Sequence, residues 1–379
     1  MSAAATQLST PRGDFDLRRY PARRRESLQA WCAADLLLLE GVCEQPIAAQ
    51  HTLVVNDDFG ALSLPLTPHS LWTDSCLSLL ALRENEALNK ASETPVIWST
   101  KAPPADIQLV VMRVPKSLPY FEYQLANIAR HLPEGATILA AGMDKHLSPQ
   151  TASVMEKWLG PTTRHRGRQK ARLFSATLHK AAVTAPARDF GGAYDCPELG
   201  ATLYALPNVF SAGQLDIGSR FLLSELQALE PVDRVIDLAC GNGVLGLAAL
   251  QRGLGQQALF CDESAMAIAS AQHNSAALLP EARDKVEFHL GDGLRECPWR
   301  NADLILCNPP FHLGHVVDDF AGRRLLAECT RYLAPSGSLC LVANRHLDYR
   351  PVLRSNFGEV DLLSSNTKFN IIVAKQPRH

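Results

Sequence analysis

Short apolar runs alternate with segments of helical spacing through the second half of this 379-residue chain. Parallel strands joined by crossover helices produce this alternation, because the helices cover both faces of the sheet and bury each strand. The runs lie at residues 234–238, 258–261, 286–289, 304–307 and 338–342, with a last one at residues 369–374. The pattern predicts an α/β fold built on a mostly parallel, doubly wound sheet.

The first half of the chain repeats this plan in a degenerate form. Residues 53–62 stand where the later half has residues 235–243, residues 71–74 correspond to 259–262, residues 109–116 to 304–311, and residues 132–147 to 333–347. Any two doubly wound domains share strand–helix alternation, but matches in the same order favour a duplication. We therefore predict two tandem Rossmann-like domains, of which the N-terminal copy is degenerate. In this alignment Asp74 takes the place of Asp262.

The length of the chain exceeds the size at which one hydrophobic core usually stops growing. Proline, glycine and alanine cluster between residues 186 and 199, as is typical of a linker. We predict domains at residues 1–188 and 189–379.

The composition is that of an ordinary soluble globular protein, 46% hydrophobic and 20% charged, with 37 basic and 39 acidic residues. The ten cysteines form no CxxC pair and no Cys/His cluster of zinc-like spacing, so we expect free thiols and no metal site. Such thiols suit a reducing cytosol. The arginine-rich start has no apolar core, and no run approaches the roughly 18 apolar residues of a membrane span. We expect a cytoplasmic protein with no membrane partner.

A glycine-containing loop follows the first strand of the C-terminal half. Its candidate cofactor-binding residues are Asp237, Ala239, Cys240, Gly241, Asn242 and Gly243. Glycines let a backbone turn sharply and approach a ligand that a Cβ would block. Gly241, Gly243 and Gly246 also spell the GxGxxG pattern of a dinucleotide site, so a nicotinamide-dependent dehydrogenase is one interpretation. Asp237 argues against it, because a carboxylate repels a pyrophosphate but attracts the ammonium group of S-adenosylmethionine.

Two further acidic residues follow the next two strands. Asp262 can accept hydrogen bonds from both ribose hydroxyls of the cofactor, or else cap the helix that begins near Glu263. The spacing favours the ribose role. Asp292 can meet the adenine amino group, or serve as a turn aspartate.

The tetrapeptide Asn308-Pro309-Pro310-Phe311 directly follows the fourth strand, at the end of the sheet where open α/β folds bind ligands. An exocyclic base amine is a poor nucleophile, so acceptors must orient its lone pair. The Asn308 amide oxygen and the Pro309 carbonyl can each accept one N–H. The prolines fix φ and lack donors, and Phe311 offers a face on which an extruded base can stack. The alternative is a proline turn that ends the strand and has no further role. The glycine loop, Asp262 and the tetrapeptide follow one another in the order expected of a methyl-transfer site, which favours the functional interpretation. We also expect Asn308 to contact the cofactor.

A dense basic run lies near the end of the N-terminal half. Its cationic residues are Arg164, Arg166, Arg168, Lys170 and Arg172, and Lys116 lies further upstream. Such a run is either a solvated loop or strand edge, or a ridge that contacts phosphates.

These motifs together resemble the bacterial ribosomal RNA guanine-N2 methyltransferases, which pair an inactive methyltransferase-like domain with an active one. The resemblance covers nearly the whole chain and is strongest to members that act on 23S ribosomal RNA. It rests on residues 56–60, 114–116, 158–163, 208–211, 215–220, 308–312 and 344–347. It implies methylation of a guanine amino group in 23S ribosomal RNA, with S-adenosylmethionine held by residues 237–243 and Asp262.

The chain departs from the family pattern at two places. Ala239 stands where the first glycine of the cofactor loop is expected, and the loop closes with alanine if that position has negative φ. The N-terminal copy has residues 113–116 where the tetrapeptide should be. We predict that this copy does no chemistry and holds RNA through Lys116 and the basic run.

Other functions remain open from the sequence alone. The nearest is the 16S guanine enzyme of the same family. An adenine-N6, cytosine-N4 or protein glutamine methyltransferase can use a similar pocket, although Phe311 in place of tyrosine and the full-length N-terminal copy argue against these. A non-catalytic RNA-binding assembly factor is a further alternative, which the presence of Asn308 and Asp262 disfavours.

Overall fold

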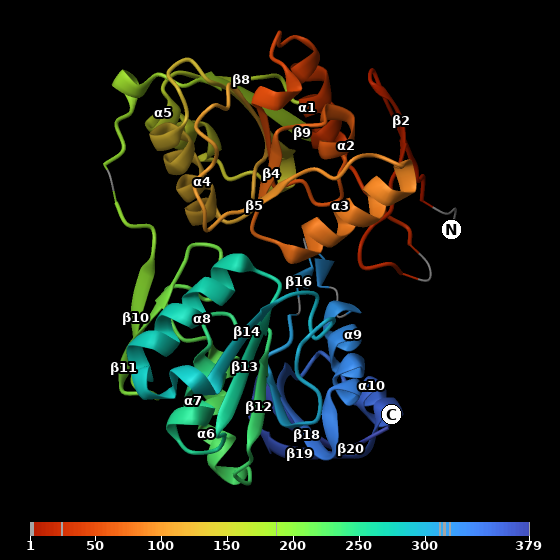
Figure 1. Ribbon diagram of the computed structural model, residues 1–379, viewed down its shortest axis with the longest axis vertical. Helices are drawn as coiled ribbons and strands as arrows, with labels where there is room; N and C mark the ends of the chain where they lie inside the picture. Colours follow the sequence, from red (N-terminus) through yellow and green to blue (C-terminus); the bar gives the residue numbers. More distant parts are fainter. Residues whose placement is uncertain are drawn as a thin grey trace. The chain divides into compact units, whose positions relative to one another are not determined.

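Two sheets of seven strands organise the chain in the computed structural model (Figure 1). The structure describes residues 4–23, 26–186, 188–310, 312–313, 316–317 and 320–378. The chain divides into two compact units, Met1–Phe190 and Gly191–His379, here called the N-terminal unit and the C-terminal unit.

The sheet of the C-terminal unit runs in the order β14-β13-β12-β15-β18-β20-β19. Its strands are β12 (Arg234–Leu238), β13 (Gln257–Asp262), β14 (Val286–Leu290), β15 (Ala302–Cys307), β18 (Leu333–Asn344), β19 (Phe357–Ser365) and β20 (Phe369–Pro377). The first five are parallel, and β20 is antiparallel to both of its neighbours. Short hairpins add β10 (Gly192–Cys196) with β11 (Ala201–Ala205), and β16 (His312–Leu313) with β17 (Val316–Val317).

Helices cover both faces of this sheet. The helices α6 (Ile217–Glu225), α7 (Val244–Gln251) and α8 (Ala265–Leu278) contribute to one apolar cluster. The helices α9 (Phe320–Glu328) and α10 (Arg350–Asn356) contribute to the other. Close packing fixes α7 on the sheet, because a Cβ at Gly246 would lie 2.5 Å from the Phe260 ring. Burial from both sides explains why β12, β13 and β15 are continuous apolar runs in the sequence.

The sheet of the N-terminal unit runs in the order β5-β4-β3-β6-β7-β9-β8. Its strands are β3 (Thr52–Val55), β4 (Ser70–Thr73), β5 (Val96–Trp98), β6 (Leu109–Arg113), β7 (Thr137–Met143), β8 (Thr162–Arg164) and β9 (Ala171–Thr177). The helices α1 (Ala33–Cys43), α2 (Ser63–Leu66) and α3 (Cys76–Asn89) pack on one face, and α4 (Leu118–His131) and α5 (Thr151–Leu159) on the other. A hairpin of β1 (Gln7–Thr10) and β2 (Gly13–Asp16) precedes them.

The two units share one topology, which confirms the predicted tandem arrangement. If the strands of each sheet are numbered from one to seven along the chain, both sheets have the order 3-2-1-4-5-7-6 from edge to edge. In both sheets strand 7 is antiparallel to strand 5. The strand registers correspond as well, since Val55 pairs with Trp72 and Met112 as Leu238 pairs with Cys261 and Cys307.

That register corrects the predicted alignment by one residue. Trp72 is the counterpart of Cys261, so Thr73, and not Asp74, is the counterpart of Asp262. The helix caps agree with this assignment. Ser75 caps α3 and Ser264 caps α8, each two residues after the position compared. The N-terminal unit therefore lacks a carboxylate at this position.

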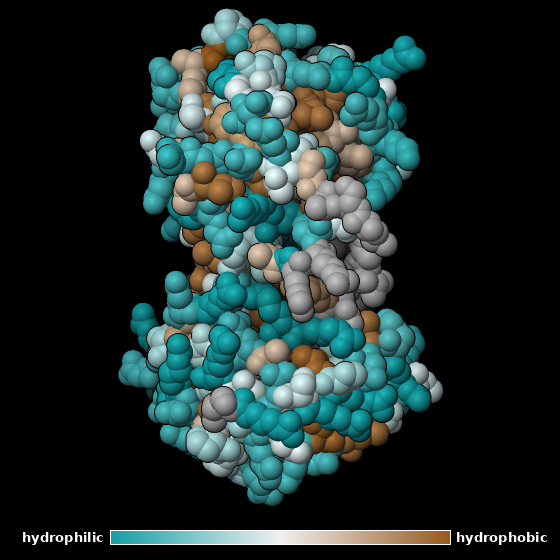
Figure 2. Space-filling model, turned by 90° about the vertical axis from the view of Figure 1, so that its right-hand side faces the viewer, coloured by the Kyte–Doolittle hydropathy of each residue, from teal (hydrophilic) through white to brown (hydrophobic). Residues whose placement is uncertain are grey.

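The surface shown in Figure 2 is mostly hydrophilic, with apolar side chains in scattered patches. No helix among the described residues is long and apolar enough to cross a bilayer.

Candidate functional site

The loop after β12 turns back through residues in the left-handed region. Gly241 has φ 55° and Gly243 has φ 87°. A Cβ at Gly241 would meet nothing nearer than Val209 Cγ1 at 3.9 Å, so the backbone here is open to a ligand. At Gly243 it would lie 3.1 Å from the Ala271 Cβ, so that glycine serves helix packing. The open backbone at Gly241 fits the close approach that S-adenosylmethionine requires.

Ala239 differs from the sequence-based expectation. Its φ is +58°, so the condition under which the loop was expected to accept alanine, a negative φ, is not met. A non-glycine residue in this region costs about 1–2 kcal/mol, which the surrounding structure must offset. Its counterpart in the N-terminal unit, Asn56, has the same φ of 58°, so both units need a left-handed residue at this turn.

Cys240 and Asn242 hold the loop in place. Both side chains are buried. The Cys240 N–H donates to the Cys261 carbonyl at 3.0 Å, and Asn242 Nδ2 donates to the Tyr194 hydroxyl at 3.0 Å. These two hydrogen bonds fix the loop between β12 and α7.

Asp237 is fully buried, with 0% of its surface exposed. Its Oδ2 accepts from the Gly246 N–H at 2.8 Å, and its Oδ1 has no partner among the described residues. Burial raises the pKa of Asp237 to about 8. The carboxyl is consequently protonated at neutral pH and fixes the start of α7. An ammonium group beside this carboxyl would lower its pKa, so the predicted attraction of the cofactor's ammonium group requires loss of the proton on binding.

This burial predicts a pH dependence of stability. The folded carboxyl keeps its proton up to about pH 8, whereas in the unfolded chain it is lost near pH 4. The folded state thus binds more protons, and the free energy of unfolding falls as pH rises between these values, by at most about 1.4 kcal/mol per pH unit. We expect chemical denaturation to show this fall for the wild type relative to Asp237→Asn, with a constant difference above about pH 8. Parallel stability curves from pH 4 to pH 9 would contradict the assignment.

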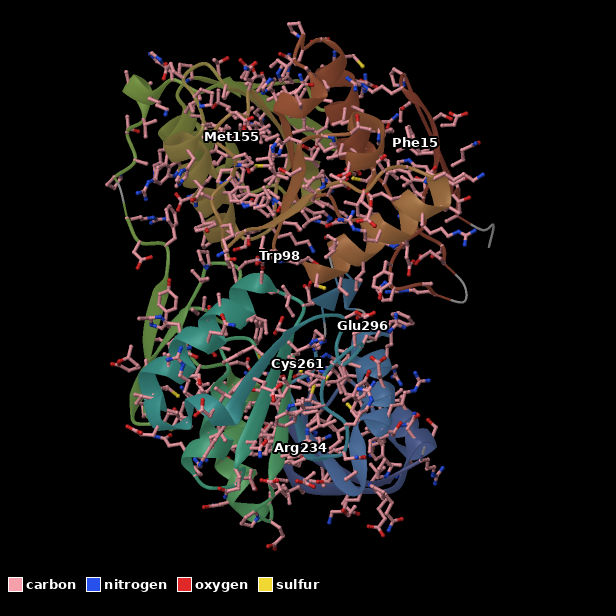
Figure 3. The ribbon with its side chains drawn as sticks, viewed as in Figure 1. Phe15, Trp98, Met155, Arg234, Cys261 and Glu296 are labelled. Atoms are coloured by element: carbon pink, nitrogen blue, oxygen red, sulfur yellow. The ribbon has the colours of Figure 1, made fainter. Side chains whose placement is uncertain are left out.

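Asp262 ends β13, directly after the buried Cys261 that Figure 3 labels. Its Oδ2 accepts from the Gly241 N–H at 2.9 Å, and its Oδ1 accepts from the Ser264 N–H at 3.0 Å. The helix cap of α8 is Ser264, whose Oγ accepts from the Ala267 N–H at 3.1 Å. The alternative that Asp262 caps this helix is therefore wrong. The half-buried carboxylate joins the glycine loop to the start of α8.

Asp292 is paired inside the protein. It is 2% exposed, and Arg324 of α9 donates to both of its oxygens, from Nη1 to Oδ2 at 2.9 Å and from Nη2 to Oδ1. Arg295 Nη1 lies 3.6 Å from Oδ2. The predicted contact with the adenine amino group would compete with these ion pairs.

Asn308 follows β15, and its amide is held by the start of α6. Nδ2 donates to Asp216 Oδ2 and to Ser219 Oγ, each at 3.0 Å. Both amide hydrogens are engaged, so Oδ1 is the atom that can accept an N–H. Pro309 is buried and Pro310 half-buried. Phe311 lies outside the described residues. Sequence reasoning gave no role to Asp216 or Ser219.

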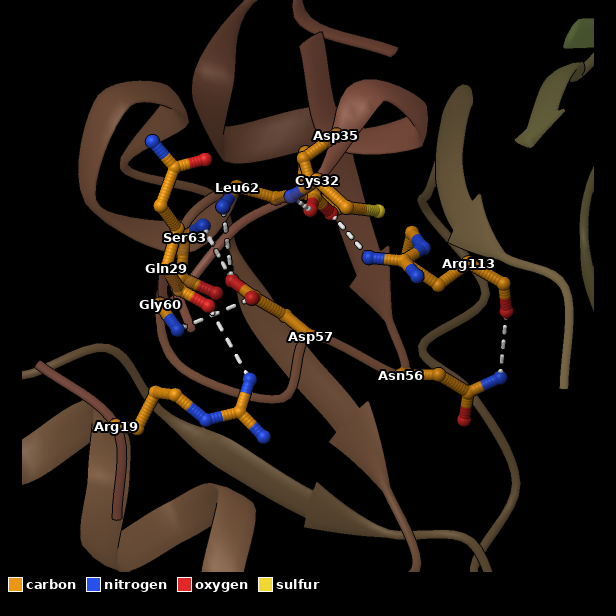
Figure 4. A network of polar contacts seen from close by, with 10 residues as sticks. All are labelled: Arg19, Gln29, Cys32, Asp35, Asn56, Asp57, Gly60, Leu62, Ser63 and Arg113. Atoms are coloured by element: carbon orange, nitrogen blue, oxygen red, sulfur yellow. Dashed lines mark hydrogen bonds and ion pairs between the residues drawn. The ribbon is translucent and has the colours of Figure 1, made fainter. Parts of the chain in front are cut away.

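The same place in the N-terminal unit holds an ion pair. Arg113 ends β6, and its Nη1 lies 2.6 Å from Asp35 Oδ1 (Figure 4). Burial alone would lower the pKa of Arg113, but Asp35 raises it above the ordinary value. Asn56 Nδ2 donates to the Arg113 carbonyl at 2.9 Å. A permanent cation here would repel the sulfonium of S-adenosylmethionine.

The loop of the N-terminal unit is filled by its own side chain. Asp57 accepts the N–H groups of Gly60, Leu62 and Ser63 at 3.0, 3.0 and 2.8 Å (Figure 4). Because the loop amides are engaged within the protein, they are not free for a ligand.

The basic run forms the β8–β9 hairpin. Arg164, Arg166, Arg168 and Lys170 are exposed and Arg172 is half-buried. Arg168 pairs with Glu40, and Arg172 Nε lies 3.1 Å from Asp144 Oδ1. Lys116 is exposed beyond the end of β6. Within the part of the chain that the structure describes, Arg164, Arg166 and Lys170 have no ion-pair partner. The described residues also include no group of three or more His, Cys, Asp or Glu side chains placed to hold a metal.

Comparison with known proteins assigns both units. Residues 5–180 match the RLMG N-terminal domain, and residues 200–373 match the methyltransferase small domain. The ribosomal RNA large subunit methyltransferase G of Alcanivorax borkumensis is 40% identical, over 96% of this chain and 95% of that protein. The protein of the same name from Shewanella frigidimarina is 36% identical, over 97% and 99%.

A solved structure has the same fold along the whole chain. The T. thermophilus 16S rRNA N2 methyltransferase in complex with AdoMet and guanosine has a TM-score of 0.78 at 24% identity, over 98% of this chain and 97% of that one. The methyltransferase small domain covers the unit that carries the glycine loop, Asp262 and Asn308. The chain is therefore a methyltransferase whose cofactor is S-adenosylmethionine. The predicted resemblance is confirmed: with this identity over nearly the full length of its relatives, the chain belongs to the family of the ribosomal RNA large subunit methyltransferases G.

Proposed function

We propose that the C-terminal unit transfers a methyl group from S-adenosylmethionine to the exocyclic N2 of a guanine in 23S ribosomal RNA. The observation that carries the proposal is the Asn308 amide, whose two hydrogens are engaged by Asp216 and Ser219 so that Oδ1 can accept an amine N–H. The names of the relatives support the large-subunit RNA as substrate. The solved structure that shares the fold is of an enzyme that acts on N2 and binds guanosine.

The cofactor-holding residues lie at the ends of the first two strands. The open backbone at Gly241 and the loop of residues 239–243 would hold the methionine part, and the Asp262 carboxylate at the end of β13 would accept the ribose hydroxyls. Asp292 would meet the adenine amino group from its place after β14. When bound, S-adenosylmethionine supplies an electrophilic methyl group.

The residues after β15 prepare the nucleophile. Asn308 Oδ1 and the Pro309 carbonyl each accept one N–H of the guanine amine, which turns its lone pair toward the methyl group. Neither proline carries an N–H that could compete for these acceptors. The new N–C bond would form as the methyl–sulfur bond of the cofactor breaks and leaves its electron pair on the sulfur, so the positive charge passes to the amine. The two acceptors stabilise that charge until one proton leaves to water. Phe311 remains the predicted stacking face for the base.

The substrate assignment is tested in cells. We expect 23S ribosomal RNA from a strain that lacks this gene to lose N2-methylguanine at one position, mapped by primer extension and mass spectrometry. The wild-type gene should restore the mark, and the Asn308→Ala gene should not. If 23S RNA were unchanged and 16S RNA lost the N2-methylguanine, the substrate would be the small-subunit RNA. If ribosomal RNA were unchanged and methylation of adenine, cytosine or protein glutamine were reduced, that group and not guanine would be the substrate.

We also propose that the N-terminal unit holds RNA through the β8–β9 hairpin and Lys116. The exposed cations without ion-pair partners among the described residues, Arg164, Arg166 and Lys170, can neutralise phosphates, whereas Arg168 and Arg172 already face carboxylates.

Charge reversal tests this surface. We expect the triple variant Arg164→Glu, Arg166→Glu, Lys170→Glu to bind 23S RNA at least about tenfold more weakly, with the slope of log K against log salt reduced by about 2. Filter binding across a salt series measures both quantities. The matched control reverses the same number of exposed charges elsewhere in this unit, at Lys101, Lys157 and Lys180. If both triple variants lost the same RNA affinity, the loss would come from the net charge of the unit and not from the hairpin, and the assignment would be overturned.

A further inference from the structure

We infer that the first turn of α6 orients the catalytic amide, with Asp216 and Ser219 as positioning residues for Asn308. This inference rests on the proposed function, since it concerns how Asn308 presents Oδ1 to the guanine amine.

The hydrogen bonds around Asp216 define the orientation. One carboxylate oxygen, Oδ2, accepts both the Ser219 N–H at 2.9 Å and the Asn308 Nδ2 at 3.0 Å. The Ser219 hydroxyl accepts the second hydrogen of Nδ2 at 3.0 Å. An ionised carboxylate is only an acceptor, so the Asn308 atom that faces it must be the nitrogen. A flipped amide would place two acceptors against each other, and the site would lose its own acceptor for the substrate.

The charge of Asp216 also favours the reaction. The hydrogen bond from Nδ2 to a carboxylate is charge-assisted and polarises the amide, which increases the negative character of Oδ1. The guanine amine gains positive charge as it is methylated. The negative charge of Asp216 lies at the nitrogen end of the amide, and the developing positive charge lies at its oxygen end, so the electrostatic interactions are attractive. This arrangement exists before the substrate binds.

The N-terminal unit gives independent support, because it has kept the contact while losing the chemistry. Cys32 precedes α1 as Asp216 precedes α6, and Asp35 stands three residues later, as Ser219 does. Asp35 Oδ1 binds Arg113, the counterpart of Asn308 at the end of the fourth strand, while its Oδ2 accepts the Cys32 N–H at 2.7 Å (Figure 4).

The shared fold thus brings the start of this helix against the end of the fourth strand in both units. The residues at the start of the helix differ between the units according to the side chain that they bind. Two carboxylate oxygens serve an arginine and a helix cap in one unit, whereas a carboxylate and a hydroxyl fix an asparagine amide in the other.

Variants at Asp216 separate orientation from helix capping. Asp216→Ser keeps an N-cap oxygen but is too short to reach Asn308, whereas Asp216→Asn keeps an acceptor at the same distance. We expect kcat of Asp216→Ser to fall by about 10- to 100-fold, because both the acceptor and its charge are lost, and that of Asp216→Asn to fall by only about fivefold, because the acceptor stays and only the charge is lost. The KM values for RNA and for S-adenosylmethionine should stay near those of the wild type, because binding contacts are untouched.

Ser219→Ala keeps the backbone N–H that the cap uses and removes only the hydroxyl acceptor. We expect its kcat to fall by about three- to tenfold with an unchanged melting temperature. The matched control is Ser224→Ala in the same helix, where the hydroxyl donates to the Phe221 carbonyl and should not matter for rate.

The assay counts N2-methylguanine formed in 23S RNA by the purified full-length protein. Wild-type kcat in both Asp216→Ser and Ser219→Ala would overturn the inference, as would a loss confined to KM or an equal loss in Asp216→Asn and Asp216→Ser. If the wild type itself formed no N2-methylguanine, the proposed function would fail instead, which distinguishes the two outcomes.

Discussion

Asn308→Ala is expected to lower the rate of methyl transfer by about a thousandfold or more, with the affinity for S-adenosylmethionine within about threefold of the wild type. The alanine removes the acceptor that turns the lone pair of the amine toward the methyl group and stabilises its developing charge. The substitution leaves the proposed cofactor site, which is the loop after β12 and Asp262, intact. Single-turnover transfer of labelled methyl to 23S RNA measures the rate, and calorimetric titration measures the affinity.

The control is Asn127→Ala, an amide of the N-terminal unit that donates to the Tyr123 carbonyl. It should leave both quantities unchanged. Retention of a tenth or more of the wild-type rate by Asn308→Ala would exclude Asn308 as the main acceptor. Loss of cofactor affinity in parallel with rate would instead make Asn308 a binding residue.

Asp262→Ala is expected to weaken S-adenosylmethionine binding by at least about 10- to 100-fold, because charge-assisted hydrogen bonds to the ribose contribute about 1.5–3 kcal/mol. The same substitution also releases the Gly241 and Ser264 amides, whose donors lie at 2.9 and 3.0 Å from the carboxylate. The loop that presents open backbone to the cofactor thereby loses an anchor, so both effects act in the same direction.

The duplicated fold supplies the control for this experiment. Thr73→Ala changes the counterpart of Asp262 in the N-terminal unit, where Oγ1 accepts from the Ser75 N–H at 3.3 Å. It should leave the dissociation constant for S-adenosylmethionine unchanged. An equal effect of both substitutions would mean that the cofactor also uses the N-terminal unit, and no effect of Asp262→Ala would remove Asp262 from the cofactor site.

Comparison of the two units explains why one copy is degenerate. Val54 stands in the register position of Asp237 and Thr73 in that of Asp262. Asp57 engages the loop amides, and Arg113 replaces the amide acceptor with a cation. The polar replacements find partners within the unit, so the fold tolerates them. The changes at Thr73, Asp57 and Arg113 each remove one feature that the proposed cofactor site has in the C-terminal unit.

Much of the fold was predictable from local patterns. Buried parallel strands need continuous apolar runs, so β12, β13, β15 and their counterparts stand out in the sequence. The edge strands β8 and β19 were not predicted, because half-exposed strands carry polar residues such as those of Thr162–Arg164. The basic run could be placed in a loop or a strand edge, and only the antiparallel pairing of β8 with β9 made it a hairpin.

The sequence by itself determined the tandem α/β architecture, the glycine loop and the tetrapeptide that begins at Asn308, because these are local patterns. The tertiary structure decided how the Asn308 amide is held, since Asp216 and Ser219 lie 92 and 89 residues from Asn308 along the chain. It also decided that Asp237 is buried, which raises its pKa, and that Asp292 is paired with Arg324. Hydrogen bonds between residues so distant leave no periodic trace in the sequence, and burial depends on helices that pack from elsewhere in the chain.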